Sequence, residues 1–201
     1  MSELFSIQLQ NRQQQGGDGV WLDLPTTTEQ VQAALRQIDI SSDNPQGLFI
    51  SGYFAEEEKR FAISYNMVLA SNVDELNFLA SRLETLSTGE RAELNAALQA
   101  PQSELFSIGR ITDFPENVDY YVHLPDVHGP AQLGDYYLNR SGMVNMPEEW
   151  KGGIDTAQFG RYVAQQEQGA FTQYGYLVKS GDEWQKVHEG QPVPEEYRVL
   201  S

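Results

Sequence analysis

The residues best suited to metal chemistry lie in one short segment of the chain. His123, Asp126 and His128, together with Asp119, offer imidazole and carboxylate groups of the kind that bind divalent metals. Pro125 prevents the helical spacing that would bring these side chains to one face. The sequence has 3 histidines and no cysteine, so it offers no second cluster of ligands. We therefore expect these to be loop or surface residues, with no metal and no cofactor.

Hydrolytic chemistry has equally little support in the sequence. No G-x-S-x-G segment or comparable elbow presents a serine nucleophile. The adjacent acids Glu148 and Glu149, like Asp74 and Glu75, diverge from each other, whereas glycosidase carboxylates face each other across a cleft. Phosphate-binding loops and dinucleotide fingerprints are also missing from the sequence. We expect a protein that is not an enzyme, and keep a hydrolase with carboxylates in a cleft as an alternative.

Carboxylates are the chemical group that this sequence supplies in excess. Between Arg110 and Arg140 the chain has no lysine or arginine, but it has the acids Asp113, Glu116, Asp119, Asp126 and Asp135. Over 201 residues, 29 Asp and Glu face 13 Lys and Arg, which gives a net charge of -16, and acids exceed bases in each quarter of the chain. This charge disfavours direct binding to nucleic acid and favours a basic protein partner. Because 40% of the residues are hydrophobic, the charge belongs to a folded body.

The location of the protein is predicted from what its sequence lacks. No apolar run approaches the roughly 18 residues that a membrane span needs. The N-terminal segment MSELFSIQLQ has neither the basic start nor the apolar core of a signal peptide. We expect a cytoplasmic protein that does not contact a membrane.

The periodicity of apolar residues predicts the elements that carry these acids. Residues 4–9 and 20–24 alternate as strands, and a helix over 28–38 follows, with Thr26 and Glu29 at capping-box spacing. Residues 48–54 and 60–69 are strand-like runs on either side of the charged turn AEEEKR, which favours a hairpin. The first module is therefore α+β.

The rest of the chain predicts more helices and a second hairpin. Two helices over 72–86 and 88–99 form a helical hairpin, with Ser71 or Asn72 capping the first and Ser87 the second. After the short segments 104–111 and 117–124 come a helix over 131–139 and one that begins after Asp155 and ends at Gly169. The second of these helices turns Phe159, Tyr162 and Val163 inward. A hairpin of 172–179 and 183–189 follows, and the C-terminal tail is extended.

Four collinear segments resemble the ArdA-type antirestriction proteins. They are GVWLDLP at 19–25, the block SNVDELNFLASRLETLSTGERAELNAAL at 71–98, MPEEWKGGIDTAQFGRYVAQQ at 146–166 and FTQYGYLV at 171–178. The I-D-x-x-x-[FY]-G-R element from Ile154 to Arg161 is the most specific of them. The resemblance covers the chain from about residue 4 to 180.

The resemblance implies an elongated, curved chain of three small α+β modules, here 1–69, 70–112 and 113–201, with short antiparallel sheets and helix pairs. It also implies a homodimer that mimics bent B-form DNA and occupies the DNA-binding groove of type I restriction-modification enzymes. By the same resemblance, we expect a mobile genetic element or its relic to encode the protein. Duplex DNA has two charges per base pair, so a net charge of -16 equals the phosphates of about 8 base pairs.

We expect the phosphate surrogates to come from the second and third modules: Asp74, Glu75, Glu84, Glu90 and Glu93, with Asp113, Glu116, Asp119, Asp126, Asp135, Glu148 and Glu149. For the dimer interface the candidates are Leu133, Tyr136, Tyr137 and Leu138, which alternatively close the core of the third module. The alternative function is an acidic adaptor that binds another basic protein.

Overall fold

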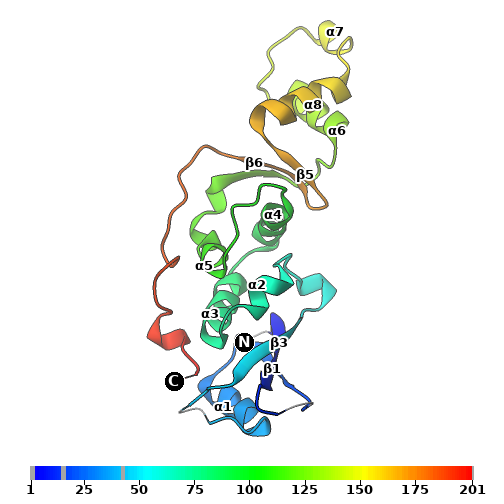
Figure 1. Ribbon diagram of the computed structural model, residues 1–201. Coiled ribbons are helices and arrows are strands. Elements are labelled where there is room, and N and C mark those ends of the chain that lie inside the picture. The colour runs from blue at the N-terminus through cyan, green and yellow to red at the C-terminus, as the bar shows by residue number, and fades with distance from the viewer. Residues whose placement is uncertain (1–2, 15–16, 42–43, 201) are drawn as a thin grey trace. The chain divides into compact units, whose positions relative to one another are not determined.

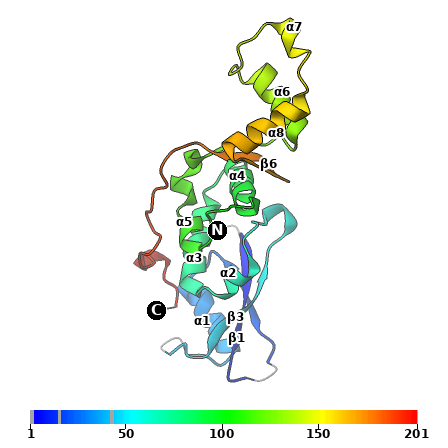
Figure 2. The ribbon, with the colours of Figure 1, turned by 45° about the horizontal axis from the view of Figure 1, so that its top comes forward.

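The N-terminal sheet forms because every second residue of its central strand is buried. The computed structural model describes residues 3–14, 17–41 and 44–200 (Figures 1 and 2). Strand β1 (Phe5–Asn11) pairs antiparallel with β2 (Val20–Leu24) on one side and with β3 (Leu48–Phe54) on the other. Helix α1 (Thr28–Gln37) buries its apolar face next to β2. The two predicted strands and the predicted helix of this region are thereby confirmed.

Contacts divide the chain into two compact units, and the sheet belongs to the first. Unit 1 comprises residues 1–87, 105–116 and 185–201, and unit 2 comprises 88–104 and 117–184. Besides the sheet and α1, unit 1 contains helices α2 (Tyr65–Leu69), α3 (Val73–Glu84) and α5 (Ile108–Thr112), with 3-10 turns η1 (Glu57–Lys59), η2 (Phe114–Glu116) and η5 (Glu195–Tyr197). The division into three modules stays a prediction.

Helix α3 has the amphipathic pattern that its sequence predicted. Leu76, Leu79 and Leu83 are fully buried on one face. Asn72 is the N-cap, and its side chain accepts a hydrogen bond from the backbone N–H of Glu75, whose carboxylate accepts from the backbone N–H of Asn72. This reciprocal pair satisfies two amides that the first turn of a helix leaves without partners.

Unit 2 combines a second antiparallel sheet with a pair of crossing helices. Its sheet has the order β4-β6-β5. The elements are α4 (Thr88–Gln99), η3 (Val118–Tyr120), β4 (Tyr121–Leu124), α6 (Pro130–Asp135), a π-helical turn η4 (Tyr136–Arg140), α7 (Glu148–Lys151), α8 (Thr156–Glu167), β5 (Ala170–Thr172) and β6 (Gly175–Lys179). Val127, Leu133 and Tyr176 form a core cluster, and α6 lies directly against α8 (Figure 1). Two three-stranded antiparallel sheets and helices confirm the α+β class.

The predicted hairpin of residues 48–54 and 60–69 is wrong in its second strand. Phe61 and Ile63 are buried in an irregular segment, and the chain then forms helix α2 from Tyr65. The irregular segment has only two alternating buried residues, Phe61 and Ile63, and the next buried residue, Val68, already belongs to α2. A run this short does not distinguish an extended segment from the start of a helix.

The predicted second strand at 183–189 is also wrong. The backbone N–H groups of Val187, His188 and Glu189 donate to the carboxylate of Asp113, so they do not take part in a strand ladder. Strand β6 instead pairs with β4 and β5.

Smaller corrections concern helix ends and one side chain. Thr27 with Gln30 forms the first capping box, in place of Thr26 with Glu29. The segment 104–111 contributes the start of α5, with Ser107 as N-cap. On α8, Tyr162 is 60% exposed and not inward. The left-handed residue at the end of α8 is Gln168 rather than Gly169. None of the helices in the described ranges combines the length and apolar character that crossing a membrane requires.

Candidate partner-binding surface

Four of the predicted phosphate surrogates are exposed in unit 2. Asp119 lies in η3, and Asp126 lies in the loop that follows β4. Glu148 and Glu149 occupy the first turn of α7, and Glu148 accepts a hydrogen bond from Lys151 Nζ at 2.7 Å. Exposed carboxylates keep their charge in water and are accessible to a basic partner. We take these four exposed side chains as the candidate partner-binding carboxylates and refer to them as the candidate surface.

Other predicted surrogates are half-buried, and two of them form ion pairs. Glu116 pairs with Arg82 inside unit 1, and Asp135 Oδ2 lies 3.3 Å from Arg140 Nε in unit 2. Glu84 and Glu90 are half-buried and have further interactions. An internal guanidinium partly cancels the charge that a carboxylate offers to a partner. These acids are also less exposed than the four above, so we expect them to contribute less, although Glu148 is likewise paired, with Lys151.

The structure assigns Glu75 and Asp74 to the local fold. The Glu75 carboxylate is committed to the capping box of α3. Asp74 Oδ1 accepts hydrogen bonds from the backbone N–H groups of Val199, at 2.7 Å, and Leu200, at 3.0 Å. Asp74 therefore fastens the C-terminal segment to α3.

The prediction that Asp113 replaces a phosphate is wrong. Its side chain is 0% exposed, so a partner cannot reach it. Its carboxylate accepts hydrogen bonds from the backbone N–H groups of His188, at 2.6 Å, Glu189, at 3.2 Å, and Val187, at 3.3 Å. A buried carboxylate is stable where several N–H groups solvate it in this way. Asp113 is therefore not available to a partner as a phosphate surrogate.

The prediction that Glu93 on α4 replaces a phosphate is also wrong, because its carboxyl is mostly uncharged at neutral pH. Burial, reinforced by the nearby acids Glu90 and Asp119, raises the pKa of the Glu93 carboxyl to about 8. A carboxyl with that pKa is mostly protonated at neutral pH and does not replace a phosphate.

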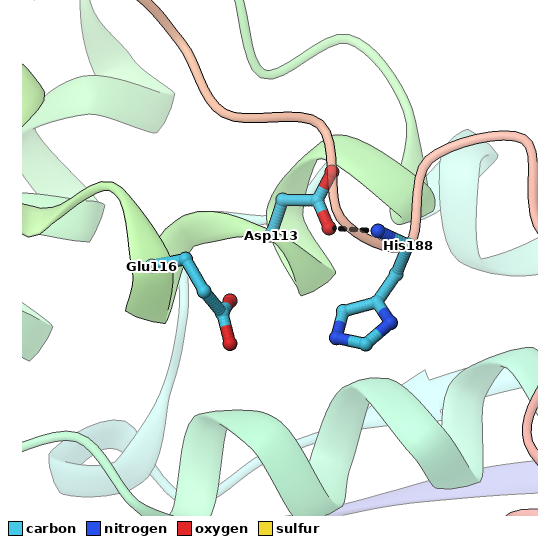
Figure 3. Close-up of side chains that lie close together, drawn as sticks. All are labelled: Asp113, Glu116 and His188. Atoms are coloured by element: carbon cyan, nitrogen blue, oxygen red, sulfur yellow. Dashed lines mark hydrogen bonds between the residues drawn. The ribbon is translucent and has the colours of Figure 1, made fainter.

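The residues around His123 that were considered as metal ligands and expected to be loop or surface residues do not converge in the described part of the chain. His123 Nε2 lies 2.7 Å from the carbonyl oxygen of Tyr174. A different group converges in unit 1. It consists of Asp113, Glu116 and His188, whose possible ligand atoms lie within 4.8 Å of one another (Figure 3). Asp113 already accepts three N–H groups and Glu116 pairs with Arg82. These contacts account for the cluster as part of the fold.

The predicted dimer residues lie mainly in the core of unit 2. Leu133 is 0% and Leu138 is 3% exposed, as in the alternative that these residues close the core. Tyr136 and Tyr137 are half-buried, and the Tyr137 hydroxyl donates to Glu167 Oε1 at 2.5 Å. Only the two tyrosines retain surface with which a second copy could make contact, so the interface stays a prediction that rests on them.

Sequence reasoning missed several exposed acids, of which three follow one another in the chain. Glu56, Glu57 and Glu58 are exposed beside and within η1 of unit 1. Their signal was present in the AEEEKR run, which was interpreted only as a turn. Glu56 Oε2 lies 3.2 Å from Lys59 Nζ, so part of this charge is compensated.

Together, the fold and the exposed carboxylates define a small acidic α+β protein that is suited to basic partners. The sequence matches the family described as antirestriction protein (ArdA) over residues 16–178. The chain therefore belongs to the ArdA antirestriction protein family. A search of curated proteins found no match. Membership implies an antirestriction role as an inhibitor protein and agrees with the resemblance of the four sequence segments.

Proposed function

We propose that this protein is a DNA-mimic inhibitor of type I restriction-modification enzymes. Its exposed carboxylates would replace DNA phosphates and occupy the DNA-binding groove of the enzyme, and the protein would act in the cytoplasm as a homodimer. The observation that carries the proposal is the excess of 29 acids over 13 bases, with Asp119, Asp126, Glu148 and Glu149 exposed on one unit.

The physical basis of the proposal is the chemistry of a DNA-binding groove. Such a groove is lined with lysine and arginine that bind phosphates without reading sequence. Carboxylates satisfy the same cations without presenting base edges. An inhibitor of this kind should therefore act on enzymes with different recognition sequences.

The folded scaffold adds to the affinity that these charges provide. Asp119 precedes β4, and Glu148 and Glu149 lie on α7, so their backbone is already ordered before contact. An acidic tail would lose conformational entropy on binding, whereas a folded element loses less. Rigid placement thus favours binding even where each carboxylate contributes little.

Neutralisation of the exposed acids tests the proposal. Because exposed ion pairs contribute about 0–1 kcal/mol each, any one of Asp119→Asn, Asp126→Asn, Glu148→Gln or Glu149→Gln should change inhibition of DNA cleavage by a type I enzyme about fivefold at most. The four substitutions together should weaken inhibition about tenfold or more. Unchanged inhibition by the fourfold variant would contradict the proposal, and a complete loss from one substitution would indicate a discrete site.

A matched control separates the position of the charge from its total. Glu58, Glu183, Glu195 and Glu196 are exposed acids that lie outside both the candidate surface and the aromatic face of the N-terminal sheet. Changing all four to Gln alters the net charge as much as the test variant does. A smaller loss of inhibition is expected from this control. Pull-down from cells with and without a type I system distinguishes the acidic-adaptor alternative, which predicts the same partner in both.

A further inference from the structure

The outer face of the N-terminal sheet carries two large exposed aromatic side chains. Trp21 on β2 is 50% exposed and Phe54 on β3 is 54% exposed. The inner face of β1 is buried and its other residues are half-buried. Trp21 and Gly52 both pair with Gln8, while Phe54 pairs with Ser6 on the same face. The two aromatics therefore occupy neighbouring rows of one outward face.

The Trp21 ring lies across this face rather than standing away from it. A Cβ built on Gly52 would lie 3.0 Å from Trp21 Cη2 and 3.0 Å from Gln8 Cβ. The indole thus extends from the edge strand β2 over Gln8 of the central strand to Gly52 of the opposite edge strand. The absence of a side chain at Gly52 leaves room for the ring. One side of the ring therefore packs on the sheet, while half of the Trp21 surface stays accessible to solvent.

Carboxylates surround the exposed aromatics at this end of the sheet. Asp23 lies in the same row as Phe54 and accepts a hydrogen bond from Ser6 Oγ at 2.6 Å. Glu3 and Glu56 lie with Phe54 around a small surface hollow that also includes Lys59. Three acids against one lysine make the surroundings of the aromatics negative. A nucleic acid base is disfavoured there, because its phosphates would meet these acids.

The far end of the same face shows the interaction that such a surface supports. The Arg12 guanidinium carbon lies 5.4 Å from the centroid of the Phe49 ring, and Phe49 pairs with Gln10, two residues along β1 from Gln8. Arginine is the cation that combines stacking on an aromatic ring with hydrogen bonds to a carboxylate. Trp21 with Asp23 offers both groups on a single strand.

We propose that the outer face of the N-terminal sheet binds an arginine-bearing basic segment of a partner protein. A guanidinium stacks on the Trp21 indole and pairs with Asp23, and apolar atoms of the segment contact Phe54. An exposed aromatic patch bordered by charge is typical of a protein interface, and tryptophan is often its strongest contact. This face belongs to unit 1, whereas the carboxylates of the candidate surface belong to unit 2. The proposal requires a basic partner, but holds whether or not that partner is a restriction enzyme.

The test uses the full-length protein and a short arginine-rich peptide, with a lysine-rich peptide of the same length for comparison. Binding is measured by calorimetry at moderate salt, which suppresses general attraction to the acidic surface. The parent protein should bind the arginine peptide more tightly, and the amide NMR signals of Ser6, Gln8 and Gly52 should shift. Trp21→Leu should weaken arginine-peptide binding about threefold to tenfold and remove most of the preference over lysine.

Trp150 provides the matched control. It is 66% exposed and has acidic neighbours, but it lies on the four-residue helix α7 instead of a sheet. Trp150→Leu should leave the affinity and the preference for arginine unchanged. Equal effects of the two tryptophan substitutions, or no effect of Trp21→Leu, would show that only net charge attracts the peptide and would overturn the proposal.

A second variant keeps the tryptophan but changes its position. Gly52→Ala places a methyl group against the end of the Trp21 ring and should lift the ring from the sheet. Binding of the arginine peptide should fall, while the thermal midpoint reports whether the sheet remains folded. Affinity equal to that of the parent, in a folded variant with a displaced ring, would also overturn the proposal.

Discussion

Gly134 on α6 and Gly160 on α8 bring the backbones of these two helices into direct contact. A Cβ added at Gly160 would lie 2.8 Å from the backbone nitrogen of Gly134, and one added at Gly134 would lie 3.1 Å from that of Gly160. Each added carbon would also overlap a carbonyl oxygen of the opposite helix, that of Pro130 or Thr156. The crossing of α6 and α8 therefore depends on the absence of side chains at both positions. A substitution at either glycine should lower the stability of the fold.

Gly134→Ala or Gly160→Ala should each lower the free energy of unfolding by about 2–3 kcal/mol, because the overlapping atoms are backbone and the helices must separate. Urea denaturation followed by circular dichroism measures the change. Gly89→Ala is the control, since an added Cβ there has no neighbour within 4 Å and alanine favours the helix. Equal stability of Gly160→Ala and Gly89→Ala would show that the two helices do not cross as described.

Asp113 should prove to be a structural residue. Asp113→Asn replaces a carboxylate oxygen that accepts backbone N–H groups with an amide that donates, so we expect a loss of about 2–3 kcal/mol of stability. Amide hydrogen exchange at residues 187–189 should accelerate. The exposed Asp126→Asn should change stability by less than about 0.5 kcal/mol. Retained protection of those amides in Asp113→Asn would refute the role described for Asp113.

The pH dependence of stability should reveal the buried carboxyl of Glu93. Its pKa is raised from the ordinary glutamate value of 4.5 to about 8 in the folded protein, so the folded state binds the proton more tightly than the unfolded state. Stability is therefore lost as the pH rises from about 4.5 to about 8. Glu93→Gln should stabilise the fold above about pH 8, by an amount on the order of 1–2 kcal/mol after allowance for solvent screening, with little effect near pH 4.5.

Thermal unfolding across this pH range measures the effect, and Glu149→Gln controls for the loss of one charge at an exposed position. If the two substitutions altered the pH dependence of stability equally, that dependence would not come from the buried carboxyl of Glu93.

Salt should have opposite effects on the fold and on the complex. At a net charge of -16 the acids repel one another, so screening should raise the thermal midpoint of the free protein. The same screening should weaken inhibition of a type I enzyme, because the proposed contacts are ionic. Raising the salt from about 0.05 M to about 0.5 M while both quantities are measured checks this expectation. Inhibition that does not depend on salt would indicate an apolar interface.

The parts of the fold that were predictable from sequence are those set by local patterns. Alternation of apolar residues predicts β1 and β2, and the stripe from Leu76 to Leu83 with the Asn72 cap predicts α3. Residues 183–189 were misassigned because the N–H groups of the last three of them, Val187 to Glu189, bind Asp113, which is remote in sequence. Local pattern contains no information on such a partner.

The same limit applies to the predicted site residues. Charge and spacing identify Asp119, Asp126, Glu148 and Glu149 as well as Asp113, but only the packing of the C-terminal segment around Asp113 shows that its side chain is inaccessible. Similarly, the raised pKa of Glu93 depends on burial, which residue type alone does not show. Sequence therefore predicts the excess of acids, and the fold decides which of them reach a partner.

Competition with duplex DNA for a purified type I methyltransferase tests the central claim most directly. A labelled duplex with the enzyme's recognition site is bound first, and the full-length protein is then titrated at fixed salt while the fluorescence anisotropy of the DNA is followed. If carboxylates replace phosphates in the groove, the duplex should be displaced completely, and more protein should be needed in proportion to the DNA concentration. A ternary complex that contains enzyme, duplex and this protein together would contradict the account.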